Sequence, residues 1–579
     1  MSTEKKVNNF ITQERLSRLL PAILSSLAFA LVVFIVAPLD IYGSNYVELD
    51  FTVANFALFL CLGAVLTAVL LVALMFCLPK TAYRFVFAFV LATALLFVVQ
   101  QNFLNFNMNS LPGDRLSDET PSAWQIVLDT AVWLIVYGGA FFAAAFVTKK
   151  GDKGDMIKTV SFVVAFALLV SQIASPIFIV INSNSRYKTN ILARSGKTEK
   201  TIITTEREFN ELASKNNVYY FCIDRFDEEY AEKGYKLDEN VFSALQGFTW
   251  YKDNVSRYGH TFPGVANMLT MKEFNVEDKR ADFLDNAYKN DDIPLHRLYD
   301  SGYEIYIYTV KYYAFTNAKH LPQYIGNLSE ATDETDSAPS LKLAAQLTGF
   351  SLYRAAPLAI KQIFDTGSTS DANGIITKKG ADGFTEWTGS NSRADELAEE
   401  EFSVGEHAKK FAFIHYDGLH DILQVSDRRM PSVLNESMEV VESFINALKS
   451  NGLYKDATII ITGDHSRPVN DLAGVNEPRR TALFVKPSGE DEGFKVSAAQ
   501  TSHDDIWATI FDSEGIDFNG EGVSVTKLSE TENRKRTFTW HTYFTGTLDE
   551  YDYEINGPSA NFANWKETAH KHVNKYLMS

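Results

Sequence analysis

The sequence has few cysteines, no excess of basic residues and no nucleotide-binding loop. Cys61, Cys77 and Cys222 are the only cysteines and all lie in apolar runs. They suggest no disulfide framework, so they neither indicate nor exclude an oxidising compartment. The net charge of −18 argues against a nucleic-acid binder, because a phosphate backbone requires a basic face. No P-loop is visible, so we expect no nucleotide substrate.

Long apolar runs fill the first third of the chain. A membrane-spanning helix requires about 20 predominantly apolar residues, and a cleaved signal peptide would account for one run at most. We therefore predict a bundle of five transmembrane helices, at residues 19–39, 53–78, 82–99, 124–147 and 160–181.

The charges between these runs predict the orientation of the bundle. Lysines and arginines collect before the first run, between the second and third, and between the fourth and fifth, whereas the other two loops carry acids. Because basic residues favour the cytoplasmic side, the amino terminus is expected inside and everything after residue 181 outside. Asp129, near the start of the fourth run, either reaches the interface or has a role within the membrane, where acids are costly.

The remainder of the chain reads as a connector followed by an α/β domain. Residues 182–217 are polar and charged, and we expect a helix along the membrane surface at 206–215. From residue 218 onward, strands alternate with helical segments, which predicts βαβ units and a largely parallel sheet. The expected strands are 218–223, 303–309, 411–415, 458–462 and 482–485. The domains are therefore 1–181, 182–217 and 218–579.

Two of these strands end in carboxylates. The strand 458–462 runs into Gly463, Asp464 and His465, and the strand 218–223 runs into Asp224. Open α/β sheets place their chemistry at the carboxyl ends of strands, and this set of donors suits zinc or manganese. The alternative is that Asp464 only caps a turn and His465 is a surface residue.

A threonine precedes a tight turn in YGHTFPGVANMLT, residues 258–270. If a helix starts near Gly264, the Thr261 hydroxyl lies near helix amides that stabilise anions. A cation beside it would activate the hydroxyl as a nucleophile. The alternative is that Thr261 is only a helix cap.

These segments together carry a resemblance to a known superfamily. The order of YYFCIDRF, HTFPGVANMLT, FIHYDGLHD, IIITGDHSR, TSHDDIWATIFDSEGI and GEGVSV resembles the alkaline phosphatase and sulfatase superfamily, over roughly residues 218–525. With the apolar runs, the layout is similar to lipoteichoic acid synthases and lipid A phosphoethanolamine transferases. The resemblance implies a sulfatase-like catalytic domain outside the cytoplasm.

The resemblance also implies roles for individual residues. Thr261 becomes the nucleophile, and Asp224, Asp464 and His465 become the metal ligands, with the Thr261 oxygen completing the shell around one divalent zinc or manganese ion. His420 becomes a general acid or hydrogen-bond donor. His415 is either a strand-end residue or exchanges roles with His420.

Some positions depart from the patterns of related families. Sulfatases that build formylglycine use C-x-P-x-R, whereas this chain has Thr261 and Val265, so sulfate-ester hydrolysis by that route is not expected. A second metal would fall to Asp417, His420 and His503, although the spacing from 417 to 420 is one residue shorter than in phosphodiesterases; His503 could instead start a helix.

Several further residues are candidates for substrate binding, namely His415, Asp417 and an arginine after His465. Arg467, and behind it Arg479 and Arg480, could hold a phosphate by paired hydrogen bonds, and surface charge is the alternative for each.

The predicted function is transfer of a phospho-substituent, of the phosphoglycerol or phosphoethanolamine type, at the cell membrane. A membrane lipid is the expected donor, a cell-envelope glycan, polymer or lipid the acceptor, and a phospho-threonine the intermediate. The alternatives are a metal-dependent phosphodiesterase or phosphatase of the same superfamily, and a catalytically inactive binding module.

Overall fold

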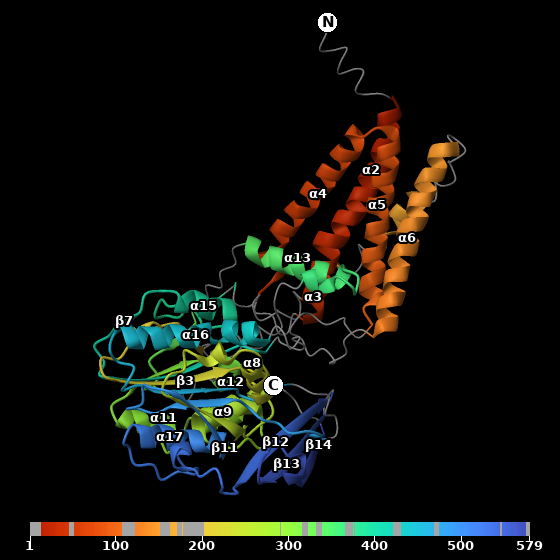
Figure 1. The fold of residues 1–579 in the computed structure, drawn as a ribbon. Helices are drawn as coiled ribbons and strands as arrows, with labels where there is room; N and C mark the ends of the chain where they lie inside the picture. Colours follow the sequence, from red (N-terminus) through yellow and green to blue (C-terminus); the bar gives the residue numbers. More distant parts are fainter. Residues whose placement is uncertain are drawn as a thin grey trace. The chain divides into compact units, whose positions relative to one another are not determined.

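The computed structural model divides into two compact units (Figure 1). Unit 1 comprises Met1–Lys197 and Ser337–Ile376, and unit 2 comprises Thr198–Asp336 and Thr377–Ser579. The structure describes residues 13–45, 51–106, 122–150, 162–168, 170, 176–177, 202–289, 291–314, 322–331, 339–364, 375, 377–420, 430–467, 474–544 and 547–574.

Unit 1 is helical. Its long helices are α2 (Gln13–Leu31), which continues through η1 (Val32–Val36) into α3 (Ala37–Asn45), then α4 (Ala57–Cys77), α5 (Lys80–Val99), continued by η3 (Gln100–Leu104), and α6 (Ala123–Lys150). Among the residues that the structure describes, four stretches are long and apolar enough to cross a membrane, namely Glu14–Gly43, Ala57–Cys77, Lys80–Leu104 and Ala123–Lys149. They correspond to the first four predicted spans. The fifth prediction, 160–181, lies largely outside the described residues, although 162–168 are helical.

A segment from the second half of the chain also belongs to unit 1. Helix α13 (Leu341–Ala355) lies across the ends of α4 and α5, and the short η7 (Lys361–Phe364) packs against α13 (Figure 1). The division at 182–217 and 218–579 did not include this insertion, which we expected to lie within the catalytic domain. Apolar residues on one face of α13 account for its place, because Leu343, Leu347 and Phe350 are fully buried against unit 1.

Unit 2 is built on a seven-stranded sheet of order β11-β4-β10-β9-β3-β8-β5. The strands are β3 (Asn216–Ile223), β4 (Phe248–Val255), β5 (Glu304–Tyr308), β8 (Lys409–Tyr416), β9 (Thr458–Thr462), β10 (Leu483–Lys486) and β11 (Phe494–Ser502). β10 is antiparallel to both neighbours and the other pairs are parallel. The prediction of a largely parallel sheet is therefore confirmed, while β4 and β11 were missed.

The five predicted strands were found because they are short apolar runs, and β4 and β11 were missed because polar residues interrupt them. β4 reads FTWYKDNV and β11 reads FKVSAAQTS. The surface helix expected over 206–215 is wrong. That stretch forms turns and the short β2 (Glu211–Leu212), which pairs with β7 (Ser403–Val404), and the neighbouring β1 (Ile202–Thr204) pairs with β6 (Leu328–Glu330).

Two hydrophobic cores cover the two faces of the sheet. Alternate residues of β3 point to opposite cores, with Phe221 in one and Tyr220 in the other. The first core includes α8 (Glu228–Leu237), α15 (Asn391–Ala398) and α16 (Met430–Ser450). The second includes α9 (Thr261–Thr270), α10 (Arg280–Ala287), α11 (Pro294–Asp300), α12 (Lys311–Ala314) and α17 (Ile506–Ser513).

A separate three-stranded antiparallel sheet follows, which the sequence patterns did not predict. Its strands are β12 (Lys535–Phe544), β13 (Thr547–Asn556) and β14 (Trp565–Asn574). Aromatic residues fill its own small core, with Phe538 and Trp565 packed edge to face at 5.4 Å.

Candidate active site

Two aspartates meet because they follow adjacent parallel strands in the same register. β3 pairs with β9 so that Val218 lies opposite Thr458 and Cys222 opposite Thr462. Asp224 and Asp464 are therefore placed at equivalent positions past the strand ends. Ligand atoms of both aspartates and of His415, from the end of β8, lie within 4.8 Å of one another, and all three residues are buried.

Thr261 joins this group from a distant part of the chain. It is the first residue of α9, and its Oγ1 lies 3.5 Å from Asp224 Oδ2 and 3.3 Å from His465 Nε2. The His465 Nε2 atom is in turn 3.8 Å from Asp224 Oδ1 and 3.4 Å from Asp464 Oδ2. The structure thus brings together all four residues of the predicted metal and nucleophile set.

Backbone groups orient the two candidate ligands that follow β9. The amides of Arg225 and His465 donate to Asp464 Oδ1 at 3.0 and 2.8 Å, which leaves Oδ2 toward His465. The His465 ring lies with Nδ1 2.7 Å from the Ser466 carbonyl oxygen, which can only accept a hydrogen bond. Nδ1 therefore donates in this contact, and Nε2 is the ring nitrogen that faces the site.

The donor set fits a divalent cation. Asp224 Oδ1, Asp464 Oδ2 and His415 Nε2 are buried and have no hydrogen-bond partner among the described residues. Buried charged groups without such partners are costly unless they are paired or coordinate a metal. Carboxylate oxygens with imidazole nitrogens suit zinc or manganese. His415 lies at the end of its strand and also belongs to this cluster, because its Nε2 is 3.8 Å from Asp224 Oδ2.

The surrounding imidazoles perturb Asp224. Burial by itself would raise the pKa of its carboxyl group, but the charges of the neighbouring His420, His465 and His415 outweigh burial and hold that pKa below its ordinary value. This direction of the pKa shift favours the ionised carboxylate that a cation would require.

His420 and Asp417 occupy the turn after β8. The His420 amide donates to the Asp417 carbonyl oxygen at 2.7 Å, and the Asp417 amide donates to Gly389. His420 is near enough to Asp224 to influence its charge. These contacts place both residues beside the cluster.

His503 and Arg467 are committed to other contacts. His503 Nε2 lies 3.4 Å from the hydroxyls of Thr462 and Thr481, and burial lowers the pKa of this histidine to about 3. Arg467 makes ion pairs with Asp227, at 3.2 Å, with Glu229, and with Glu477, at 3.0 Å. The guanidinium of Arg467 is therefore paired with these three acids, which does not favour the predicted role in binding a phosphate.

Three residues near the cluster were missed in the sequence. Arg225 has a left-handed backbone, with φ of 58°, and its guanidinium donates to the His420 carbonyl. Arg280 lies over the Phe262 ring, 4.3 Å from its centroid, and the Tyr313 ring meets His415 at 5.7 Å. Burial raises the pKa of the Tyr313 hydroxyl, as do Asp224 and Asp417. Only Arg225 had a sequence signal, because it directly follows Asp224.

The C-terminal sheet borders the turn that carries Thr261. The rings of His260 and Trp540 are 4.7 Å apart, and those of His260 and His465 are 6.2 Å apart. Gly259 fits here because a Cβ on it would lie 2.4 Å from the Trp540 ring. The sheet β12–β14 therefore forms one wall beside Thr261.

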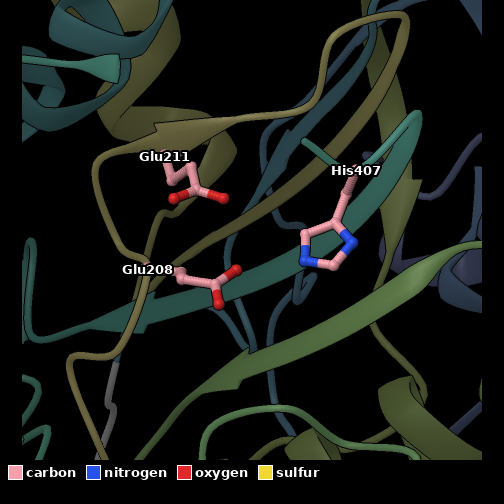
Figure 2. Close-up of side chains that lie close together, drawn as sticks. All are labelled: Glu208, Glu211 and His407. Carbon is pink, nitrogen blue, oxygen red and sulfur yellow. The ribbon is translucent and has the colours of Figure 1, made fainter. Parts of the chain in front are cut away.

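A second group of acids and a histidine lies at the other end of the strands. Glu208, Glu211 and His407 point toward one another (Figure 2). They precede β3 and β8, whereas Asp224 and the residues around it follow them. The Lys410 amine lies close by and donates to the carbonyl oxygens of Glu208 and Glu211, and the Tyr306 hydroxyl donates to Glu208. With its negative charge already offset, this group is not proposed as a metal site.

Comparison with known proteins gives a family and several structural similarities. Residues 395–516 match the family model described as Sulfatase. Lipoteichoic acid synthase LtaP from Listeria monocytogenes is 13% identical, with 64% of this chain and 90% of that chain covered and a TM-score of 0.33. Phosphonate monoester hydrolase SpPMH from Silicibacter pomeroyi is 10% identical, with 62% and 89% covered and a TM-score of 0.34.

A third similar structure is Ps i-CgsB in complex with k-i-k-neocarrahexaose, 12% identical, with 61% of this chain and 86% of that chain covered and a TM-score of 0.38. The comparison with curated proteins gave no significant match. The family model spans β8, β9 and the segment from Asp464 through α17, which carry most of the candidate site. The resemblance to sulfatases that the sequence motifs indicate is therefore confirmed by the family model over residues 395–516.

Proposed function

We propose that this protein is a membrane-bound, metal-dependent transferase that moves a phospho-substituent from a lipid donor to an acceptor of the cell envelope through a phosphorylated Thr261. The observation that carries the proposal is the position of Thr261 Oγ1, 3.5 Å from Asp224 Oδ2 and 3.3 Å from His465 Nε2, at the start of α9. A hydroxyl beside buried carboxylate and imidazole groups that could hold a cation is placed to act as a nucleophile.

The residues suggest a sequence of two displacements. Thr261 releases its hydroxyl proton to solvent, and its Oγ1 attacks the phosphorus of a phosphodiester as the alkoxide. The bond to the lipid oxygen breaks, and the protonated imidazole of His420 donates a proton to the departing oxygen. An acceptor hydroxyl then attacks the phospho-threonine and gives its proton to the same imidazole, and Thr261 leaves as the alkoxide that began the cycle. A bound divalent cation would favour loss of the Thr261 proton and stabilise the charge on the phosphoryl oxygens.

Positive charge near the cluster supports an anionic substrate. The Arg280 guanidinium lies on the ring of Phe262, the residue next to the nucleophile, and close enough to Tyr313 to affect its hydroxyl. Arg467, which the sequence suggested for this role, pairs instead with three acids. We propose Arg280 as a phosphoryl-binding arginine because its guanidinium lies on the ring of the residue that follows Thr261.

The packing of α13 supports a site outside the cytoplasm. Four spans return the chain at residue 150 to the side from which α2 begins, whereas α13 packs on the opposite ends, beside α3 and the start of α4. An odd number of crossings is therefore needed between residues 150 and 341, which agrees with a fifth span at 160–181. Basic residues around the inner loops assign the α2 start to the cytoplasm, so the site faces outward, where a lipid-linked donor remains in the bilayer.

Intact-mass analysis of the purified protein tests the proposal. Incubation with manganese or zinc and with phosphatidylglycerol or phosphatidylethanolamine vesicles, without acceptor, should add one head-group phosphate to the chain. Peptide mapping should place it on Thr261. Thr261→Val keeps the volume and loses the hydroxyl, so it should carry no adduct. An adduct elsewhere, or an equal one on Thr261→Val, would contradict the nucleophile.

Hydrolysis of the same bond is the second candidate, because water could replace the acceptor hydroxyl. The same Thr261 site serves both reactions, so the fate of the label distinguishes them. Label retained in a glycan, polymer or lipid product indicates transfer, and label released as free head-group phosphate indicates hydrolysis. A protein that binds no metal and forms no adduct would instead be an inactive binding module.

A further inference from the structure

Residues 337–376 interrupt the sequence of unit 2, but they fold with the helices of unit 1. One face of α13 is apolar and fully buried, through Leu343, Leu347 and Phe350. It packs on the aromatic group formed by Tyr42, Phe51 and Phe56, whose rings are 5.3 to 6.1 Å apart. These rings lie between the end of α3 and the start of α4, at one end of the spans.

Polar contacts at the end of α5 reinforce this packing. The buried Lys361 amine donates to Asn105 Oδ1 at 2.9 Å and to the Tyr353 carbonyl oxygen at 2.9 Å. Asn105 Nδ2 donates in turn to the Arg354 carbonyl oxygen at 2.9 Å. Gln100 Nε2 donates to Asn105 Oδ1 at 3.1 Å, so the asparagine is bound from both sides. Span and insertion therefore complete each other's hydrogen bonds.

The acid within α6 has its partner in the same insertion. Asp129 is fully buried, and its Oδ2 accepts a hydrogen bond from the Leu358 amide at 2.9 Å. The sequence left open whether Asp129 only reaches the membrane interface; the structure gives it a contact with the insertion. An ion pair also joins Arg354 to Asp40 of α3, at 3.7 Å. Residues from three spans thus converge on the stretch from Tyr353 to Lys361.

We propose that residues 339–364 are a docking element by which the catalytic unit binds noncovalently to the outer ends of its own spans, independently of the peptide link through residues 151–201. Separation would break the hydrogen bonds that the insertion makes with Asp129 and Asn105, and it would expose the apolar face of α13. Unmade hydrogen bonds to buried charged groups and exposed apolar area both oppose separation. The peptide link is then not what keeps the catalytic unit on the membrane.

A cleavage experiment on the full chain tests this. A site-specific protease sequence with flanking glycine and serine is placed between Asn190 and Ile191, and the protein is purified in detergent through a tag on its amino terminus. After complete cleavage we expect the fragment that begins at Ile191 to stay bound to the tagged spans. In a second protein, residues 339–364 are replaced by a glycine and serine linker, and cleavage should release the fragment.

Single substitutions test whether Lys361 contributes to the retention of the fragment. Lys361→Met removes the amine that bridges Asn105 and Tyr353, and should speed release of the fragment at least tenfold, since a hydrogen bond to a charged group contributes enough to change an equilibrium by that factor. Lys378→Met is the matched control, because Lys378 lies outside residues 339–364 and its substitution should leave the release rate unchanged. These readouts do not depend on catalysis, so they stand apart from the transferase proposal.

Two outcomes would overturn the docking element. One is complete release of the fragment from the otherwise native protein once the link is cut. The other is equal retention with and without residues 339–364, which would assign the attachment to different contacts. Equal release rates for Lys361→Met and Lys378→Met would show that Lys361 does not contribute to the docking element.

Discussion

Replacing Asp464 by asparagine should have opposite effects on the metal-free and the metal-loaded protein. Ligand oxygens of Asp464 and Asp224 lie within 4.8 Å of each other and both residues are buried. With an effective dielectric constant of about 20, two such charges repel by roughly 3.5 kcal/mol. The neighbouring imidazoles offset part of this, so we expect Asp464→Asn to stabilise the metal-free unit 2 by about 1 to 3 kcal/mol.

The metal-loaded protein should respond in the other direction. A cation at 100 times its dissociation constant stabilises the native chain by about 2.7 kcal/mol, and Asp464→Asn should lose most of this gain. The side-chain oxygen of the introduced asparagine can still accept from the amides of Arg225 and His465, so the turn is preserved. Thermal unfolding followed by tryptophan fluorescence, with a chelator and then with added zinc or manganese, measures both effects.

Asp227→Asn is the matched control. Asp227 is also buried near the strand ends, but it accepts from the Arg467 amide at 2.9 Å and pairs with its guanidinium at 3.2 Å. Removing that charge should lower stability with and without metal. The reasoning fails if Asp464→Asn lowers the unfolding temperature of the chelated protein, or if it keeps the full stabilisation by metal.

Three further outcomes are expected. Gly259→Ala places a Cβ 2.4 Å from the Trp540 ring, so it should lower the free energy of unfolding by about 1 to 3 kcal/mol. Turnover should also fall, while metal binding, measured by titration, persists; unchanged turnover would contradict this prediction. Arg280→Gln should raise KM for a phospholipid donor about tenfold without changing metal affinity, and a purely structural arginine would change stability instead. Burial lowers the pKa of Lys410 to about 8, against the raising effect of the acids beside it. Unfolding restores the ordinary pKa of 10.5, so between pH 8 and 10.5 the unfolded chain binds more protons than the folded chain. The free energy of unfolding should therefore rise with pH in this range, by up to about 1.4 kcal/mol per pH unit. Lys410→Met should abolish this rise, and a slope equal to that of the native protein would refute the assignment to Lys410.

The strand ends of unit 2 could be predicted because they depend on local signals. β9 was predicted at its observed bounds, Thr458–Thr462, because a short apolar β-branched run that ends in a turn is typical of a buried strand in a parallel sheet. The convergence of Asp224 and Asp464 followed from the rule that parallel strands end at one edge. Thr261 was placed with them by resemblance, and the distances now agree with that placement.

The remaining features depend on contacts that no local pattern encodes. β4 is paired on both sides although polar residues break its apolar run. Arg280 reaches Phe262 from 18 positions along the chain, through tertiary packing alone. The helix expected over 206–215 has helix-forming residues, but Phe209 and Leu212 are drawn into the core beside β3, and the chain turns instead.

The apolar face of α13 bears on how the catalytic unit can be prepared in water. A fragment that begins at Thr198 and omits the helices before it would still carry Leu343, Leu347 and Phe350, now without the aromatic rings that cover them. Such a surface promotes self-association. A fragment that remains monodisperse will need the stretch from 337 to 376 excised as well, with Asp336 joined to Thr377 by a short polar bridge.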